Sequence, residues 1–164
     1  MILDSTCSDK KIWPRFASIR MDIRRDVNPD IVASACYLPF RDGIFQEIYC
    51  DPPHYISKEG FGFTHRPFKG LEHLKKDFER FGYWKTKEEF LSFLSQVNRE
   101  FVRTLKRNSL LNFKIACGVD KRTLRIQDMS VLTNFEITKS KSRPAKTFFS
   151  KATTYFLTMK PIPA

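Results

Sequence analysis

The sequence predicts an α/β fold built on a mostly parallel, seven-stranded sheet with one antiparallel strand. Short apolar runs alternate with turn residues in the first third of the chain, and a long amphipathic helix follows further on. The chain then ends in two strand-like runs joined by a basic connection. Alternating strands and helices are typical of parallel sheets, whereas two successive strands favour an antiparallel hairpin. We interpret residues 1–164 as one domain, because this length supports a single hydrophobic core.

The first four strands are expected at short apolar runs. These cover residues 1–4 (MILD), 17–22 (ASIRMD), 30–34 (DIVAS) and 46–51 (QEIYCD), and three of them end in an aspartate. The carboxyl ends of parallel strands are where open α/β sheets build their binding sites. The sequence therefore predicts a ligand-binding rim that is rich in carboxylates.

The second and third runs are unusually close in the sequence. Only residues 23–29 separate them, whereas a parallel crossover through a helix needs about a dozen residues. Either a helix has been pruned from one face of the sheet or one of the two strands is misassigned. A pruned face would be partly uncovered, and a self-complementary homodimer would be one way to cover it.

The second half of the chain contains the clearest helix, at residues 86–107. Thr86 and Glu89 have capping-box spacing, and one face of this helix is apolar, formed by Phe90, Phe93, Leu94, Val97, Phe101 and Leu105. A strand is expected at residues 110–117. An amphipathic helix at 122–134 and strands at 135–140 and 153–160, joined by the basic connection KSKSRPAK, complete the chain.

Residues 55–84 follow neither the helical nor the strand period. Aromatic and basic side chains alternate along them, and a long loop of this kind beside a site is often functional. The alternative is a short helix near residues 71–81 that packs Leu71, Leu74 and Phe78 into the core.

The charge of the chain is uneven. The net charge is +11, yet residues 1–54 hold seven Lys or Arg against eight Asp or Glu, so residues 55–164 carry +12. This excess favours a polyanionic partner, nucleic acid first, and the alternative is a solvated basic surface. No apolar run of eighteen residues and no signal-peptide pattern is present, so we expect a cytoplasmic protein without a membrane span. The four cysteines lack metal-ligand spacing, and we expect free thiols and no metal.

Two stretches resemble a known family. These are PDIVASACYLPFRDGIFQEIYCDPPH, residues 29–54, and EFVRTLKRNSLLNFKIA, residues 100–116. They are similar to the Rossmann-like (class I) S-adenosylmethionine-dependent methyltransferases that methylate amines, and the resemblance extends over essentially the whole chain. It implies S-adenosylmethionine as cofactor and an exocyclic amine of a DNA or RNA base as acceptor. Adenine N6 is the first choice, and guanine N2 and cytosine N4 remain open.

The resemblance implies a catalytic role for the tetrapeptide DPPH. An exocyclic base amine is a poor nucleophile because its lone pair is delocalised into the ring. Preorganised acceptors counter this by stabilising the charge that develops on the nitrogen. By resemblance, Asp51 and the carbonyl of Pro52 accept the two N–H bonds and Pro53 helps to fix that carbonyl. His54, where the family more often has Tyr, Phe or Trp, stacks on an extruded base.

The resemblance also assigns cofactor residues at the first three strand ends. The loop after the first strand, with Asp4, Thr6, Cys7 and Ser8, approaches the methionine moiety, and Ser8 stands where the family has a glycine. Asp22 binds the ribose hydroxyls; the alternative is a strand-end acid paired with Arg24 or Arg25. Near the adenine ring the resemblance places Ser34, Ala35 and Cys36.

Two basic segments are expected to bind the nucleic acid. The first supplies Phe61, Phe63, His65 and Arg66, and the connection between the last two strands supplies Lys139, Lys141, Arg143 and Lys146. A catalytically silent relative that only binds nucleic acid is a second interpretation, which Ser8 favours and the DPP tripeptide disfavours. A methyltransferase acting on a protein or small molecule is a third, and it leaves the basic charge unexplained.

Overall fold

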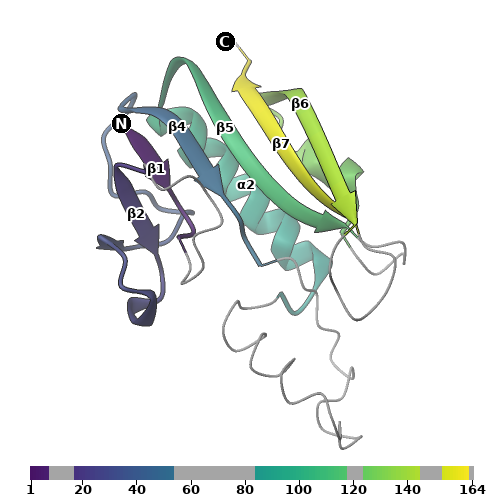
Figure 1. Cartoon of the computed structure of the whole chain (residues 1–164), viewed down its shortest axis with the longest axis horizontal. Helices are drawn as coiled ribbons and strands as arrows, with labels where there is room; N and C mark the ends of the chain where they lie inside the picture. Colours follow the sequence, from purple (N-terminus) through teal and green to yellow (C-terminus); the bar gives the residue numbers. More distant parts are fainter. Residues whose placement is uncertain (8–16, 54–83, 118–123, 145–152, 163–164) are drawn as a thin grey trace, which may run out of the picture.

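The computed structural model describes residues 1–7, 17–53, 84–117, 124–144 and 153–162. It consists of one twisted sheet with a long helix across one face (Figure 1). The strands are β1 (Ile2–Asp4), β2 (Ile19–Asp22), β3 (Ile31–Val32), β4 (Phe45–Cys50), β5 (Leu105–Cys117), β6 (Phe135–Pro144) and β7 (Thr153–Pro161). Within these ranges the helices are α2 (Lys87–Thr104) and two 3-10 turns, η1 (Arg25–Val27) and η2 (Ile126–Val131).

The sheet has the order β3-β2-β1-β4-β5-β7-β6. Strand β7 runs antiparallel to both of its neighbours, and the remaining pairs are parallel. The predicted α/β class, with seven strands of which one is antiparallel, is therefore confirmed. The strand order reverses between β1 and β4, and such a switch point is where open α/β sheets bind ligands.

Helix α2 holds the core together, as its apolar stripe predicts. Thr86 caps it, with its hydroxyl accepting a hydrogen bond from the Glu89 N–H at 3.2 Å. Its inner face is fully buried against the sheet through Phe90, Leu94, Val97 and Phe101. The helix ends at Thr104 rather than at residue 107, because the buried Leu105 pairs with Phe45 and starts β5 directly.

The short crossover between β2 and β3 contains a single 3-10 turn, η1, and the two strands are parallel. Of the two alternatives, the pruned helix is therefore the correct one. The predicted helix at 122–134 is wrong over its described part, which forms η2 and not an α-helix. Its apolar residues Ile126, Met129 and Leu132 recur every three positions, which is the period of a 3-10 helix.

Strand β6 is longer than predicted. It reaches Pro144, so Lys139, Lys141 and Arg143 belong to the strand and not to the connection that follows it. The reason is tertiary pairing, since each of these residues has a partner on β7 that extends the ladder. No described helix is long and apolar enough to cross a membrane.

Candidate active site

Asp4, the last residue of β1, is a buried carboxylate at the switch point. Only 8% of it is exposed, and its Oδ1 accepts a hydrogen bond from the Thr6 N–H at 3.4 Å. Burial raises the pKa of Asp4 from 3.8 to about 6. The Thr6 hydrogen bond and the charge of Arg20 oppose this shift, while the charges of Asp51 and Asp22 add to it. The three predicted aspartates are thus close enough to interact electrostatically.

The raised pKa of Asp4 predicts how stability depends on pH. The folded protein disfavours the ionised form, so the contribution of Asp4 to stability is greatest below about pH 4 and falls as the pH rises through about 6. Asp4→Asn should therefore raise the free energy of unfolding at pH 7.5 by up to about 3 kcal/mol and leave it nearly unchanged at pH 4. Urea denaturation at the two pH values measures this difference. An Asp4→Asn effect that is the same at both would contradict it.

The end of β4 is tied to the end of β1. The Asp51 N–H donates to the Thr6 hydroxyl at 2.6 Å, and both the N–H and the hydroxyl of Ser5 donate to the Tyr49 carbonyl, at 2.9 and 2.8 Å. Through these bonds Thr6 fixes the backbone at Asp51. Thr6 and Asp51, predicted for cofactor and substrate respectively, are therefore in direct contact.

The Asp51 carboxylate forms an ion pair with Lys114. The ammonium of Lys114 lies 2.6 Å from Oδ2 of Asp51, and only 13% of the lysine and 7% of the aspartate side chain is exposed. Sequence reasoning missed Lys114. The signal available was a lone lysine between the apolar residues Phe113 and Ile115, in a run predicted to be a strand. That strand, β5, lies next to β4, which ends directly before Asp51.

A tryptophan binds the backbone of the second of the two prolines that follow Asp51. The indole N–H of Trp84 donates to the Pro53 carbonyl at 2.8 Å. The Trp84 ring packs on Phe93, with ring centroids 4.9 Å apart, and on Phe90 at 5.7 Å. Trp84 thus connects the start of α2 to the DPP segment. The carbonyl that it binds belongs to Pro53, one residue beyond Pro52, which is predicted to bind the amine.

At the end of β2, the Asp22 Oδ1 accepts a hydrogen bond from the Arg24 N–H at 3.0 Å. The Arg24 guanidinium pairs instead with Asp26, its Nε lying 3.1 Å from the Asp26 Oδ1. The charge of Asp22 adds to the Asp26 hydrogen bond in raising the pKa of Arg24. Binding of the ribose and pairing with Arg24 or Arg25, the two roles weighed for Asp22, both stay predictions.

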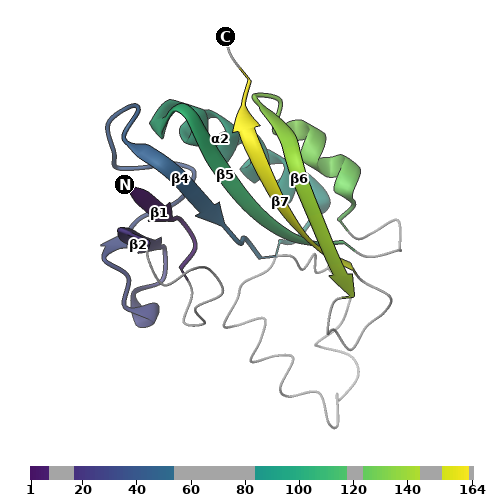
Figure 2. The same cartoon turned by 45° about the horizontal axis from the view of Figure 1, so that its top comes forward.

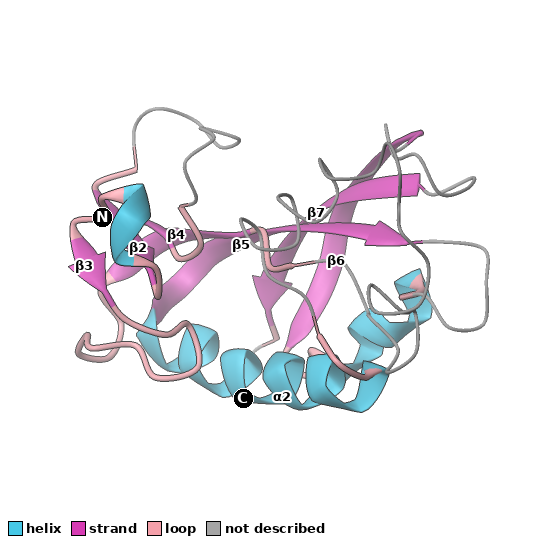
Figure 3. Cartoon of the chain, turned by 90° about the horizontal axis from the view of Figure 1, so that it is seen from below, coloured by secondary structure: helices cyan, strands magenta, loops and turns pink. Residues whose placement is uncertain are grey.

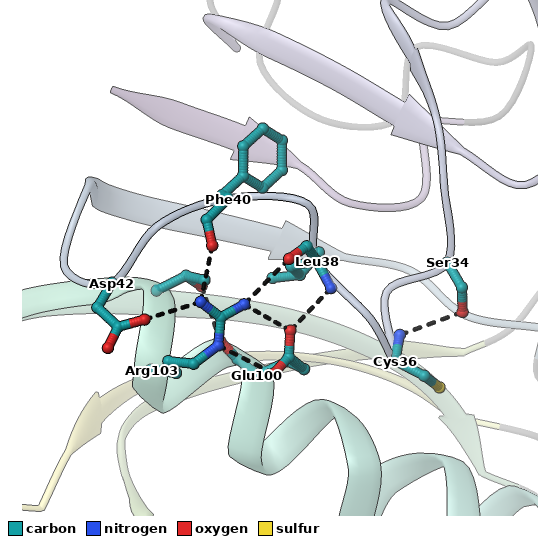
Figure 4. Close-up of polar contacts among 8 residues, drawn as sticks. Ser34, Cys36, Leu38, Phe40, Asp42, Glu100 and Arg103 are labelled. Carbon is teal, nitrogen blue, oxygen red and sulfur yellow. Dashed lines mark hydrogen bonds and ion pairs between the residues drawn. The ribbon is translucent and has the colours of Figure 1, made fainter.

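The segment after β3 is anchored to α2 by a charged network. Arg103 donates to the Leu38 and Phe40 carbonyls and to the carboxylates of Asp42 and Glu100 (Figure 4). Glu100 also accepts from the Leu38 N–H at 2.8 Å, and these hydrogen bonds lower the pKa of Glu100.

The anchored segment carries the residues predicted near the adenine ring. The Ser34 hydroxyl accepts from the Cys36 N–H at 3.2 Å (Figure 4). Ala35, between these two residues, is buried. Burial raises the pKa of the Cys36 thiol, so this thiol is not activated.

Removing the anchor should destabilise the protein. Arg103→Met is expected to lower the free energy of unfolding by about 1.5–3 kcal/mol, because charge-assisted hydrogen bonds of a partly buried guanidinium are lost. Urea denaturation measures the change. The matched control is Arg99→Met, at an exposed position of the same helix. Its free energy of unfolding is expected to lie within about 0.5 kcal/mol of that of the unaltered chain. If Arg103→Met lowered the free energy of unfolding no more than Arg99→Met does, the network would not stabilise the protein.

Other predicted residues are placed as follows. Cys7 is buried, and burial raises the pKa of its thiol to about 11. All four cysteines are free thiols, as predicted. A cluster of side chains able to hold a metal ion is not found within the described ranges. The predicted helix near residues 71–81 lies outside the described residues, as do Ser8, His54, Phe61, Phe63, His65, Arg66 and Lys146.

Comparison with known proteins places this geometry in a fold. A scan against protein-family models and a search of curated proteins find no match. Among solved structures, the chain is similar to the PH0226 protein of Pyrococcus horikoshii OT3 (13% identity, TM-score 0.59, covering 98% of this chain and 81% of that one). It is also similar to a SAM-dependent methyltransferase of Methanosarcina mazei (12% identity, TM-score 0.59, covering 99% of this chain and 92% of that one). A third similar structure is the cyclase SpnF (12% identity, TM-score 0.58, covering 99% of this chain and 74% of that one). The chain therefore has the Rossmann-like fold of the class I S-adenosylmethionine-dependent methyltransferases.

Proposed function

We propose that the protein is an enzyme that transfers a methyl group from S-adenosylmethionine to an exocyclic amine of a nucleic-acid base, with adenine N6 favoured. The observation that carries this proposal is the position of Asp51-Pro52-Pro53 directly after β4, at the switch point of a methyltransferase fold. A similar fold also occurs in a cyclase, so the reaction is argued from these residues and not from the fold.

The strand ends fit S-adenosylmethionine. Asp4, Asp22 and Asp51 are near enough to interact electrostatically, with burial as the main cause of the raised pKa of Asp4 and the charge of Arg20 opposing it. Carboxylates at these strand ends suit a ligand that carries sulfonium and ammonium charges and ribose hydroxyls. Asp4 and the Thr6–Cys7 loop would hold the methionine end, Asp22 the ribose, and the Ser34–Cys36 segment the adenine. When bound, the cofactor supplies an electrophilic methyl group.

The chain's own residues would bind and polarise the acceptor amine. Lys114 and Thr6 fix Asp51 from two sides, through its carboxylate and its backbone N–H. An acceptor held in this way costs little reorganisation when charge develops on the amine. The Pro52 carbonyl would accept the second N–H, and the Trp84 hydrogen bond to Pro53 restricts the segment that carries it. His54 would stack on the base.

The cofactor assignment is tested at Asp22. Asp22→Ala should weaken S-adenosylmethionine binding by about 1.5–3 kcal/mol, as expected when hydrogen bonds to a charged group are lost. Isothermal titration calorimetry measures the affinity, and Asp26→Ala, an exposed acid four residues on, is the matched control. An unchanged affinity in Asp22→Ala would remove this residue from the site.

The reaction is tested by transfer of tritium from labelled S-adenosylmethionine, measured in parallel on single-stranded RNA, DNA and a mixture of proteins. Label in a nucleic acid, followed by digestion to nucleosides, identifies the base and so separates adenine from guanine and cytosine. The second candidate is a silent relative that binds nucleic acid, which the basic β6 favours. It would bind nucleic acid but give no label in any substrate.

A further inference from the structure

The sheet has two faces of different character over β5, β7 and β6. On β5, the residues Leu111, Phe113 and Ile115 are fully buried on the side of α2. Because side chains alternate along a strand, Asn112 and Lys114 lie on the opposite side. Figure 3 shows α2 running along one side of the sheet, and η2 packs against α2 on that same side. Over β5, β7 and β6, no helix in the described part of the chain packs on the other side, which we call the open face. It carries Lys114, of which 13% is exposed.

Strand pairing continues the open face from the candidate active site to the edge of the sheet. Lys114 pairs with Phe156 on β7, and Phe156 pairs with Lys141 on β6. Directly paired residues of antiparallel strands share a face. A row therefore crosses the sheet from Asp51 through Lys114 and Phe156 to Lys141.

Strand β6 brings three cations to this face. Lys139, Lys141 and Arg143 occupy alternate positions, pair with Thr158, Phe156 and Thr154, and are all exposed. Figure 2 shows β6 as the outer strand beside β7. Alternate residues of a strand are about 6.8 Å apart, so the three positive charges form an evenly spaced line.

An arginine of this line lies on an aromatic ring. The Arg143 guanidinium lies 4.9 Å from the centroid of the Phe156 ring. This cation–π contact holds the guanidinium beside Phe156, so a cation and an aromatic ring lie next to each other on this face. Evenly spaced cations beside such a pair fit a polyanion that also carries bases, because bases stack on aromatic rings and on guanidinium groups.

The geometry points to a single strand of nucleic acid as the occupant of the open face: we propose that its phosphates lie along Lys139, Lys141 and Arg143 and that it continues across β7 and β5 toward Asp51. This rests on the proposed function for the destination of the strand. Three strand spacings of about 4.8 Å place β6 about 14 Å from β4, which is roughly two nucleotides of an extended chain. A single strand is favoured over a duplex, because a broad sheet face does not fit into the groove of a duplex. Unpaired bases, in contrast, can reach the Arg143 guanidinium beside Phe156.

Fluorescence anisotropy tests this with labelled twelve-nucleotide RNA and DNA single strands and their duplexes, without cofactor. The test variant is Lys139→Gln/Lys141→Gln/Arg143→Gln. It should weaken single-strand binding at least tenfold in low salt and reduce the slope of log affinity against log salt by about two units, since each phosphate contact contributes about 0.7. The control, Arg99→Gln/Lys106→Gln/Arg107→Gln, removes the same charge from exposed positions on α2 and the start of β5 and should change affinity less than threefold.

Equal losses in the test and control variants would overturn the proposal, because binding would then depend on net charge alone. Duplex bound as tightly as single strands would overturn the choice of a single strand. Phosphatidylserine vesicles that bind the unaltered chain, lose binding in the test variant and displace the RNA would assign the face to a lipid surface instead. Binding does not need methyl transfer, so a chain that passes this test but labels no nucleic acid refutes only the proposed reaction. A chain that labels nucleic acid while the test variant binds normally refutes only the open-face assignment.

Discussion

Replacing Asp51 with alanine is expected to slow methyl transfer by about 10²–10³-fold, as when one preorganised electrostatic group is lost from an active site. Under the proposed function, the Asp51 carboxylate contributes when positive charge develops on the amine. The affinity for S-adenosylmethionine should stay within a few fold, because in the proposed function the strand ends of β1, β2 and β3 would hold the cofactor. Single-turnover tritium transfer measures the rate, and calorimetry measures the cofactor affinity.

Two further variants control this experiment. Asp51→Asn keeps an acceptor oxygen without the charge and should give an intermediate rate, whereas Asp26→Ala removes an exposed acid and should leave the rate unchanged. Alanine also leaves Lys114 without its ion pair, so rates are compared where circular dichroism shows each variant folded. A rate for Asp51→Ala within threefold of the unaltered chain would refute the role of Asp51 in the reaction.

Replacing Lys114 with methionine is expected to lower the free energy of unfolding by about 3–5 kcal/mol. The Asp51–Lys114 pair is largely buried, with 7% and 13% of the side chains exposed, and removing the lysine leaves the carboxylate in a poorly hydrated place without this cation. A loss of this size is a large part of the stability of a domain. Urea denaturation with the linear extrapolation measures it.

The double variant Asp51→Leu/Lys114→Met separates the two charges from their pairing. Because a buried ion pair can be replaced by apolar groups at little cost, this variant should recover most of the loss seen in Lys114→Met. The matched control is Lys106→Met, which replaces an exposed lysine on the same strand. It should change the free energy of unfolding by no more than about 0.5 kcal/mol. If Lys114→Met cost no more than Lys106→Met, the pair would be solvated in solution and would not fix Asp51.

The rim of the sheet could be predicted from local pattern. Asp4, Asp22 and Asp51 each end a short apolar run, and in a parallel sheet the ends of such runs meet at one edge. The charges of Asp51 and Asp22 both raise the pKa of Asp4, which agrees with that placement. Helix α2 could also be predicted, because its Thr86 cap and its apolar face are local properties of one segment.

The contacts that hold Asp51 could not be predicted, because they join residues far apart in the sequence. Lys114 follows it by 63 positions and Trp84 follows Pro53 by 31. Thr6, which accepts from the Asp51 N–H, precedes it by 45. A sequence pattern identifies a lysine or a tryptophan, but only the register of neighbouring strands brings it to the site.

The sequence by itself determined the class of fold, the strand ends that form the candidate site and the basic character of the C-terminal part, since these follow from periodicity and composition. Tertiary structure decided the rest. Pairing with β7 extended β6 to Pro144 and converted a basic connection into a line of cations on one face of the sheet. The physical reason is that backbone hydrogen bonds between strands depend on the partner strand, which no local stretch of the sequence specifies.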